Sequence, residues 1–287
     1  MNDTRKPGPS LAAVRPGLNP EETYKVDDLL RVMARLRDPD GGCPWDIKQT
    51  FRTIAPHTLE ECYELIDAIE RNDLPHLAEE LGDVMFQVVF YSQLGREMGA
   101  FDFESVVDGL VRKLISRHPH VFAEGEIEGR FNGEIEVDQV KANWEAIKQE
   151  ERNAKQHVGT LADVPVALPA LTRAQKLQKR AAGVGFDWSQ LSAVIDNLEG
   201  EISELREALS TGNADHIADE FGDVLFSAVN VGRHLKLDAE SALRAANSKF
   251  ERRFNAMEFT ALAQGVTLSD ESSEALEARW RAVKASD

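Results

Sequence analysis

Apolar residues recur at helical spacing along most of the chain after residue 20. Positions three or four apart share one face of a helix, so each such segment predicts a helix with one buried face. The segments are separated by turns rich in Gly, Pro, Asn and Asp. The pattern predicts an all-α protein with helices over residues 26–36, from 58 onward, 73–97, 101–117, 137–155, 171–181, 189–210 and from 213 onward, followed by two more that carry Lys249 and Trp280.

The predicted start of the second helix affects how Glu61 is interpreted. The stretch from Cys43 to Pro56 is predicted to be a loop, and Thr58 is a suitable N-cap for the helix that follows it. The pattern Thr58-x-x-Glu61 is also a capping box, which would give Glu61 a purely structural role. That interpretation leaves the neighbouring acid Glu64 unexplained.

Four short patterns occur in the same order in both halves of the chain, namely E-x-x-E, E-x-x-D, K-x-x-x-R and W-x-x-x-K. The first copy consists of Glu61, Glu64, Glu80, Asp83, Lys113, Arg117, Trp144 and Lys148. The second copy consists of Glu201, Glu204, Glu220, Asp223, Lys249, Arg253, Trp280 and Lys284. Both copies keep the same spacing between the two acidic patterns, and again between the arginine and the tryptophan. The repeat predicts two similar helical bundles in tandem.

The composition between the patterns suggests where these domains begin and end. Residues 1–20 contain several Pro and Gly and little apolar material, which is typical of a disordered leader. Residues 156–169 are predicted to be a linker, because Gly159, Pro165 and Pro169 interrupt any helix there. We therefore expect an N-terminal domain at 21–155 and a C-terminal domain at 170–287.

The acids of each copy indicate a metal site. Residues three apart lie on one face of a helix, so two neighbouring helices would direct four carboxylates toward one point. Asp83 lies at the edge of the apolar run from Leu81 to Tyr91, where a buried charge would need a cation or a hydrogen-bonding partner. Carboxylate oxygens favour Mg²⁺ or Mn²⁺ over zinc or copper.

The remaining patterns suit a nucleoside triphosphate. Mg²⁺ held by carboxylates can bridge phosphate oxygens and promote attack of water on phosphorus. Lysine and arginine can neutralise phosphate charge as the transition state develops. The tryptophans have two interpretations, stacking on a base or packing in a core. The alternative for the whole set is a non-catalytic helical dimerisation or regulatory module whose acids are merely solvated.

Charge and composition limit the classes of partner that the protein can have. The 33 lysines and arginines stand against 50 acids, and the formal charge is −17. This argues against a nucleic-acid polymer or an anionic membrane as partner. Two cysteines, no apolar signal segment and no long apolar span fit a cytoplasmic protein. Neither a His-Asp dipeptide nor a G-x-x-x-x-G-K-[ST] loop occurs, which sets aside two other classes of phosphohydrolase.

Several longer strings resemble the MazG family of nucleoside triphosphate pyrophosphohydrolases. The strings are Gly42-Cys43-Pro44-Trp45-Asp46, Glu60-Glu61-x-x-Glu64 with Glu80-Leu81-Gly82-Asp83, Arg117-His118-Pro119-His120-Val121-Phe122, Val184-Gly185-Phe186-Asp187-Trp188 and Lys249-Phe250-Glu251-Arg252-Arg253-Phe254. The resemblance implies tandem MazG domains in a homodimer that cleaves an NTP between its α- and β-phosphates to NMP and pyrophosphate. It also implies broad base tolerance, a housekeeping role against aberrant nucleotides, and catalysis chiefly by the C-terminal copy.

The family's functional positions can be carried over one by one. Its metal ligands match Glu201, Glu204, Glu220 and Asp223, with Glu61, Glu64, Glu80 and Asp83 as the second set. Its nucleotide-contacting positions match Lys249, Arg252, Arg253, Trp280 and Lys284, with Lys113, Arg117, Trp144 and Lys148 as the second set. Lys249 and Arg253 would act in catalysis together with the acids. One departure is Gly200, which stands where the first copy has Glu60.

Overall fold

A computed structural model of the protein describes residues 23–130, 133, 136, 139–140, 143–144, 147 and 159–286. Within these residues the chain forms nine α-helices with defined bounds, further helical residues at 139–140, 143–144 and 147, and no β-strand, so the predicted all-α class is confirmed. The chain divides into two compact units, Met1–Ile147 and Lys148–Asp287. The expected leader at 1–20 lies outside the described residues. So do Lys148 and most of the helix expected at 137–155.

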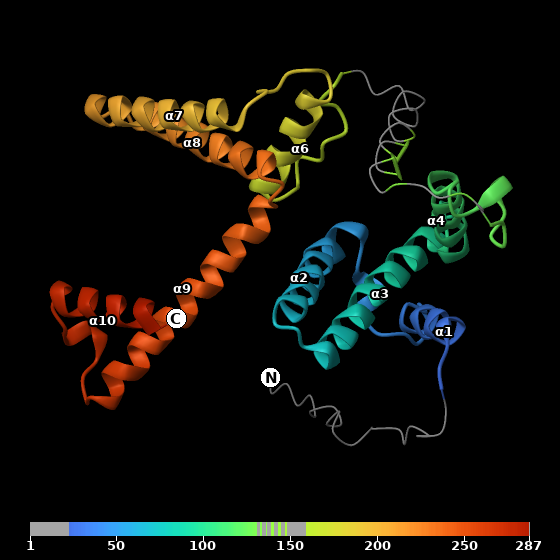
Figure 1. Cartoon of the computed structure of the whole chain (residues 1–287). Helices are drawn as coiled ribbons and strands as arrows, with labels where there is room; N and C mark the ends of the chain where they lie inside the picture. Colours follow the sequence, from blue (N-terminus) through green and yellow to red (C-terminus); the bar gives the residue numbers. More distant parts are fainter. Residues whose placement is uncertain are drawn as a thin grey trace. The chain divides into compact units, whose positions relative to one another are not determined.

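The first unit is built around an antiparallel pair of helices, α2 (Phe51–Glu70) and α3 (Leu74–Glu97) (Figure 1). Both α1 (Val26–Leu36) and α4 (Phe103–Arg117) pack against α3. Two short 3₁₀ helices, η2 (Asp46–Lys48) and η3 (Ala123–Gly125), lie in the connecting segments. The buried core consists of Met33, Ile54, Val89, Phe90 and Leu94. It therefore joins α1 and the start of α2 to the C-terminal half of α3.

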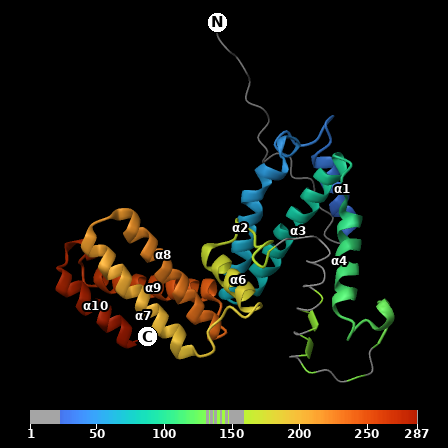
Figure 2. The same cartoon turned by 90° about the horizontal axis from the view of Figure 1, so that it is seen from above.

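The second unit repeats the helix pair. Helices α7 (Leu191–Thr211) and α8 (Ala214–His234) run antiparallel, joined by a tight turn at Gly212, whose φ of 68° favours glycine. Helix α6 (Ala170–Ala182) packs against α8, while α10 (Ser273–Ser286) packs against the long α9 (Ala239–Ala263). The 3₁₀ helix η4 (Leu268–Asp270) connects the last two. Figure 2 shows α7 and α8 side by side from a second direction.

The predicted start of α2 is wrong. This helix begins at Phe51, and Thr50 is its N-cap, accepting a hydrogen bond from the backbone N–H of Thr53. Thr58 lies inside the helix, where its hydroxyl donates to the carbonyl oxygen of Ile54. Pro56 suggested a boundary because proline disfavours a helix interior, yet burial of Ile54 in the core and the cap at Thr50 keep this segment helical. The capping-box interpretation of Glu61 is therefore excluded.

The expected burial of Asp83 is also wrong. The apolar run of α3 is buried on one side only, since Leu81, Met85 and Val88 are 51%, 47% and 41% exposed. Asp83 lies on an exposed part of the same helix. The buried acid is Glu80, three residues earlier and 6% exposed. An unpaired charge is thus expensive at Glu80 rather than at Asp83.

Other helix boundaries agree closely with the sequence patterns. The first helix spans Val26–Leu36 as predicted, and α3 follows its N-cap Asp73. The side chain of Asn213 caps α8 by accepting from the backbone N–H groups of Asp215 and His216. No helix among the described residues has the length and apolar character that crossing a membrane requires.

Two acidic clusters as candidate metal centres

Three acids meet between α7 and α8. Glu201 and Glu204 lie one turn apart on α7, and Glu220 faces them from α8. One carboxylate oxygen from each lies within 4.8 Å of the others. The two helices are antiparallel neighbours joined by a short turn, so a pair of acids spaced by one turn on α7 can face a single acid on α8.

The first unit contains the same arrangement between α2 and α3. One carboxylate oxygen each of Glu61, Glu64 and Glu80 lies within 4.8 Å of the other two. The sequence repeat is thus a structural repeat at the level of the side chains. The predicted grouping of these three acids in each copy agrees with the geometry, although their role as ligands stays a prediction.

The fourth predicted acid of each copy acts on the cluster through its charge. Burial raises the pKa of Glu201 above its ordinary value, and repulsion from Asp223 and then Glu204 raises this pKa further. In the first unit the pKa of Glu61 is raised by burial and then by Asp83. Two like charges close to a carboxyl disfavour its ionised form. Each cluster therefore gains from a cation that neutralises it.

A buried oxygen in each cluster has no hydrogen-bond partner among the described residues. The Oε2 atoms of Glu80 and Glu220 are buried and accept no hydrogen bond. Buried carboxylate oxygens are normally paired, because leaving one unpaired costs free energy. A cation seated among the acids would satisfy these atoms, and an all-oxygen donor set fits Mg²⁺ or Mn²⁺. The residues present fit a divalent cation.

Each cluster also has polar neighbours that the sequence patterns did not identify. His76 contacts Glu80, and His216 contacts Glu220 at the same position four residues earlier. The Nδ2 group of Asn197 donates to Glu201 Oε1 at 3.4 Å and to Ser227 Oγ at 2.9 Å. The histidines had a signal, since H-x-x-x-E precedes the second acidic pair in both halves. Asn197 had none, because His57 occupies the corresponding place in the first copy.

The predicted nucleotide-contacting residues lie on other helices. Lys249, Arg252 and Arg253 belong to α9, while Trp280 and Lys284 belong to α10. The C-terminal part of α9 and the whole of α10 extend away from the α7–α8 pair (Figure 1). The ring of Trp280 lies 5.4 Å from that of Phe250, a contact that fits the packing interpretation of this tryptophan.

In the first unit, the described members of the corresponding set also lie outside the two helices that carry the acids. Lys113 and Arg117 lie on α4. Trp144 is 38% exposed. None of these residues comes from α2 or α3, so in both copies the acids alone form a compact group within one helix pair.

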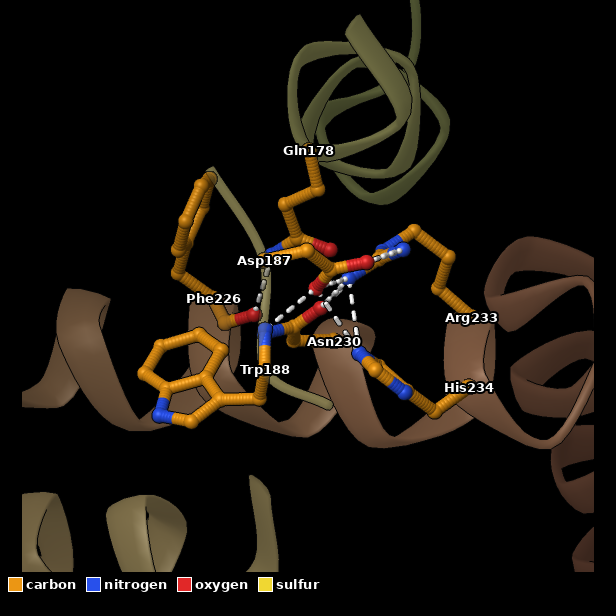
Figure 3. Close-up of polar contacts among 7 residues, drawn as sticks. All are labelled: Gln178, Asp187, Trp188, Phe226, Asn230, Arg233 and His234. Atoms are coloured by element: carbon orange, nitrogen blue, oxygen red, sulfur yellow. Dashed lines mark hydrogen bonds and ion pairs between the residues drawn. The ribbon is translucent and has the colours of Figure 1, made fainter. Parts of the chain in front are cut away.

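A second polar network holds the loop before α7 (Figure 3). Asp187 accepts hydrogen bonds from both Nη groups of Arg233, one at 2.9 Å, and its pKa is lowered to about 2 chiefly by this guanidinium. His234 Nε2 lies 3.0 Å from the same carboxylate, and the backbone N–H of Trp188 donates to it. The Gly185-Phe186-Asp187-Trp188 string therefore fastens this loop to the end of α8.

A known protein-family profile matches both parts of the chain that contain the acidic clusters. The sequence profile described as the MazG nucleotide pyrophosphohydrolase domain matches residues 49–122 and again 190–257. These two ranges contain the two acidic clusters. The profile thus recognises the same duplication that the structure shows.

Individual relatives agree with the profile, two of them over nearly their full length. The nucleoside triphosphate pyrophosphohydrolase of Escherichia coli (strain K12) is 48% identical over 91% of this chain and 97% of its own length. The nucleoside triphosphate pyrophosphohydrolase/pyrophosphatase MazG of Thermotoga maritima is 41% identical over 91% and 96%. The nucleoside triphosphate pyrophosphohydrolase of Mycolicibacterium smegmatis is 36% identical over 62% of this chain and 52% of its own. The chain belongs to the MazG family of nucleotide pyrophosphohydrolases.

Proposed function

We propose that the chain is a Mg²⁺-dependent nucleoside triphosphate pyrophosphohydrolase, which converts NTPs and dNTPs to the monophosphate and pyrophosphate. The observation that carries this proposal is the acidic cluster, which occurs twice and each time contains a buried carboxylate oxygen that no other described residue contacts by a hydrogen bond. The similarity to the nucleoside triphosphate pyrophosphohydrolases of E. coli and T. maritima supports the same activity. Mn²⁺ is the expected substitute for Mg²⁺, since both favour oxygen ligands.

A bound divalent cation supplies charge neutralisation at the phosphates and makes water a better nucleophile. Glu201, Glu204, Glu220 and Asp223 would hold the cation, the first three through carboxylate oxygens that lie within 4.8 Å of one another. In the overall reaction, water attacks the α-phosphorus and the bond from this phosphorus to the α–β bridging oxygen breaks. Pyrophosphate leaves with that oxygen, and the water proton passes to solvent.

Side chains on α9 and α10 are assigned to the nucleotide itself. Lys249, Arg252, Arg253 and Lys284 neutralise the phosphates, and Trp280 contacts the base. The family resemblance carries this assignment, and the side chain of Lys249 is exposed on α9, where its long alkyl stem lets the charge reach a ligand. In the first copy the matching residues are Lys113, Arg117, Trp144 and Lys148.

We assign catalysis to the C-terminal copy, as the family resemblance implies. Gly200 replaces an acid in that copy, so the position of Glu60, the matching residue of the first copy, tells whether the missing acid matters. The Glu60 side chain is 63% exposed and lies 3.5 Å from His57, another exposed residue. Glu60 is also the smallest contributor to the raised pKa of Glu61. The acid that Gly200 replaces is therefore peripheral to the cluster, and the C-terminal site lacks none of its three central acids.

Exposed apolar side chains support a homodimer. Leu81, Met85 and Val88 on α3 are about half exposed, and on α8 Phe221 and Leu225 are 53% and 44% exposed. Apolar rows of this kind are typical of surfaces that another chain covers. We therefore include homodimerisation in the proposal. The family resemblance adds a cytoplasmic housekeeping role against aberrant nucleotides.

The deciding experiment incubates the purified protein with a panel of NTPs and dNTPs and Mg²⁺, then separates phosphate from pyrophosphate. We expect pyrophosphate and the monophosphate as products, and loss of turnover in excess EDTA. Release of phosphate would contradict the assigned bond. Absence of turnover together with unchanged nucleotide binding in a Glu204→Ala variant would favour the alternative, a helical dimerisation or regulatory module.

A further inference from the structure

In each cluster, a histidine in the first turn of a helix contacts the glutamate whose Oε2 atom is buried. In the first unit, Nε2 of His76 lies 2.7 Å from Oε1 of Glu80. In the second unit, Nε2 of His216 lies 3.1 Å from Oε1 of Glu220. The carboxylate accepts, so the ring nitrogen donates. In both copies the other oxygen of the same glutamate, Oε2, is buried and has no hydrogen-bond partner in the part of the chain that the structure describes.

These contacts differ from ordinary pairs on a solvated helix. An exposed pair four residues apart contributes little, because water competes for both groups. The Arg71–Asp67 pair is such a case, with side chains 69% and 46% exposed. The carboxylates that the histidines contact are only 8% exposed at Glu80 and 13% at Glu220. Each histidine therefore fixes a carboxylate that water reaches poorly.

Helix stability does not account for the histidines. His76 and His216 are each the third residue of their helix, at the end where the helix dipole favours acids and disfavours cations. The cap residues Asp73 and Asn213 already accept the backbone N–H groups of these positions. What both histidines share beyond the cap is the contact with the cluster.

We propose that His76 and His216 are positioning residues, each of which holds one oxygen of Glu80 or Glu220 so that the other oxygen points into the cluster as a metal ligand. Ligating carboxylates commonly need such a hydrogen-bonded neighbour, and losing it weakens metal affinity. The inference rests on the proposed function for the identity of the ligand, a divalent cation. It adds the residues that orient the buried ligand.

The test measures Mn²⁺ affinity by electron paramagnetic resonance, with one cluster disabled so that the other is read alone. His216→Ala and His216→Gln are made in a Glu64→Ala background, and His76→Ala in a Glu204→Ala background. Arg71→Ala serves as the control for loss of an exposed pair. Circular dichroism confirms that each variant is folded, which is expected because both rings are more than one-third exposed.

We expect each His→Ala variant to bind Mn²⁺ about tenfold more weakly or worse, and His216→Gln, which keeps an N–H donor, to recover most of the affinity. Raising Mn²⁺ should restore the turnover of His216→Ala. Unchanged Mn²⁺ affinity in a wild-type-like active enzyme would overturn the inference alone. Weakened Mn²⁺ affinity in a protein without any NTP hydrolysis would overturn the proposed function and leave the inference standing.

Discussion

Arg233 donates hydrogen bonds from both of its terminal nitrogens to the carboxylate of Asp187, one of them at 2.9 Å. The pair connects the loop before α7 to the last turn of α8, and both side chains are at most one-quarter exposed. This contact lies at the end of the α7–α8 pair opposite the turn at Gly212, and the acidic cluster lies further along the same two helices. The contact between Arg233 and Asp187 therefore stabilises the two helices that carry the acidic cluster as well as the loop before α7.

Asp187→Asn should destabilise the protein. The pKa of Asp187 is lowered to about 2, so the ionised carboxylate contributes about 1–2 kcal/mol at neutral pH after allowance for solvent screening. That contribution is complete above the ordinary value of 3.8 and is lost as pH falls toward 2. Urea unfolding of wild-type and variant should thus differ at pH 7 and converge near pH 2. An equal difference at both pH values would contradict the ionic origin.

Gly200→Ala should stabilise the protein without changing turnover. A methyl group at this position would meet no neighbouring atom within 4 Å, and alanine is favoured over glycine inside a helix by about 1 kcal/mol. Gly200→Glu, which restores the doubled glutamate of the first copy, should also leave turnover unchanged because the side chain of Glu60 points outward. Thermal melts and steady-state rates measure both effects. A large rate increase in Gly200→Glu would mean that the first glutamate acts in the chemistry.

The sequence predicted most of the helices and the grouping of the acids, because both depend on residue spacing along one helix. Spacing does not report which side of a helix the neighbouring elements cover. For that reason Asp83 was expected to be buried, whereas the structure buries Glu80. Thr58 likewise resembled an N-cap only in its local sequence. The helix in fact begins at Phe51, because Ile54 packs in the core and keeps the preceding segment helical.

The histidines show a different limit. A histidine four residues before a glutamate is common on solvated helices, so the pattern around His76 carried little information by itself. Its meaning depends on the burial of Glu80, which is a tertiary property. The repeat of the same contact at His216 was present in the sequence and provided the available signal.

A divalent cation should stabilise the protein in a pH-dependent way. The pKa of Glu201 is raised by burial and by nearby acids, so the folded protein holds this proton to higher pH than the unfolded chain does. Without metal, stability therefore falls as pH rises through this raised pKa. Mg²⁺ or Mn²⁺ needs the ionised carboxyls and should offset the loss, by about 2.7 kcal/mol at a hundredfold excess over Kd.

Thermal melts in Mg²⁺ and in EDTA measure this effect. The Tm difference between the two conditions should be large at pH 7.5 and small at pH 4.5, where the acids of the cluster bind protons in competition with the metal. Glu201→Gln should reduce the difference at pH 7.5. A Tm that is equal in Mg²⁺ and EDTA at pH 7.5 would argue against a metal site in either cluster.

The last prediction separates the two copies by removing one acid from each. Glu204 and Glu64 occupy the same place in their clusters, and both are exposed enough to be removed without a buried cavity. Loss of a ligand from the working site should lower kcat about a hundredfold or more. The same change in an idle site should act only through stability, by about 1 kcal/mol.

We therefore expect Glu204→Ala to abolish turnover and Glu64→Ala to leave most of it, measured as pyrophosphate release under saturating Mg²⁺ and NTP. Far-UV circular dichroism of both variants checks that each remains folded. The opposite result, an inactive Glu64→Ala and an active Glu204→Ala, would assign catalysis to the N-terminal cluster. Partial losses in both variants would mean that both clusters turn over substrate, because each variant then retains one working site.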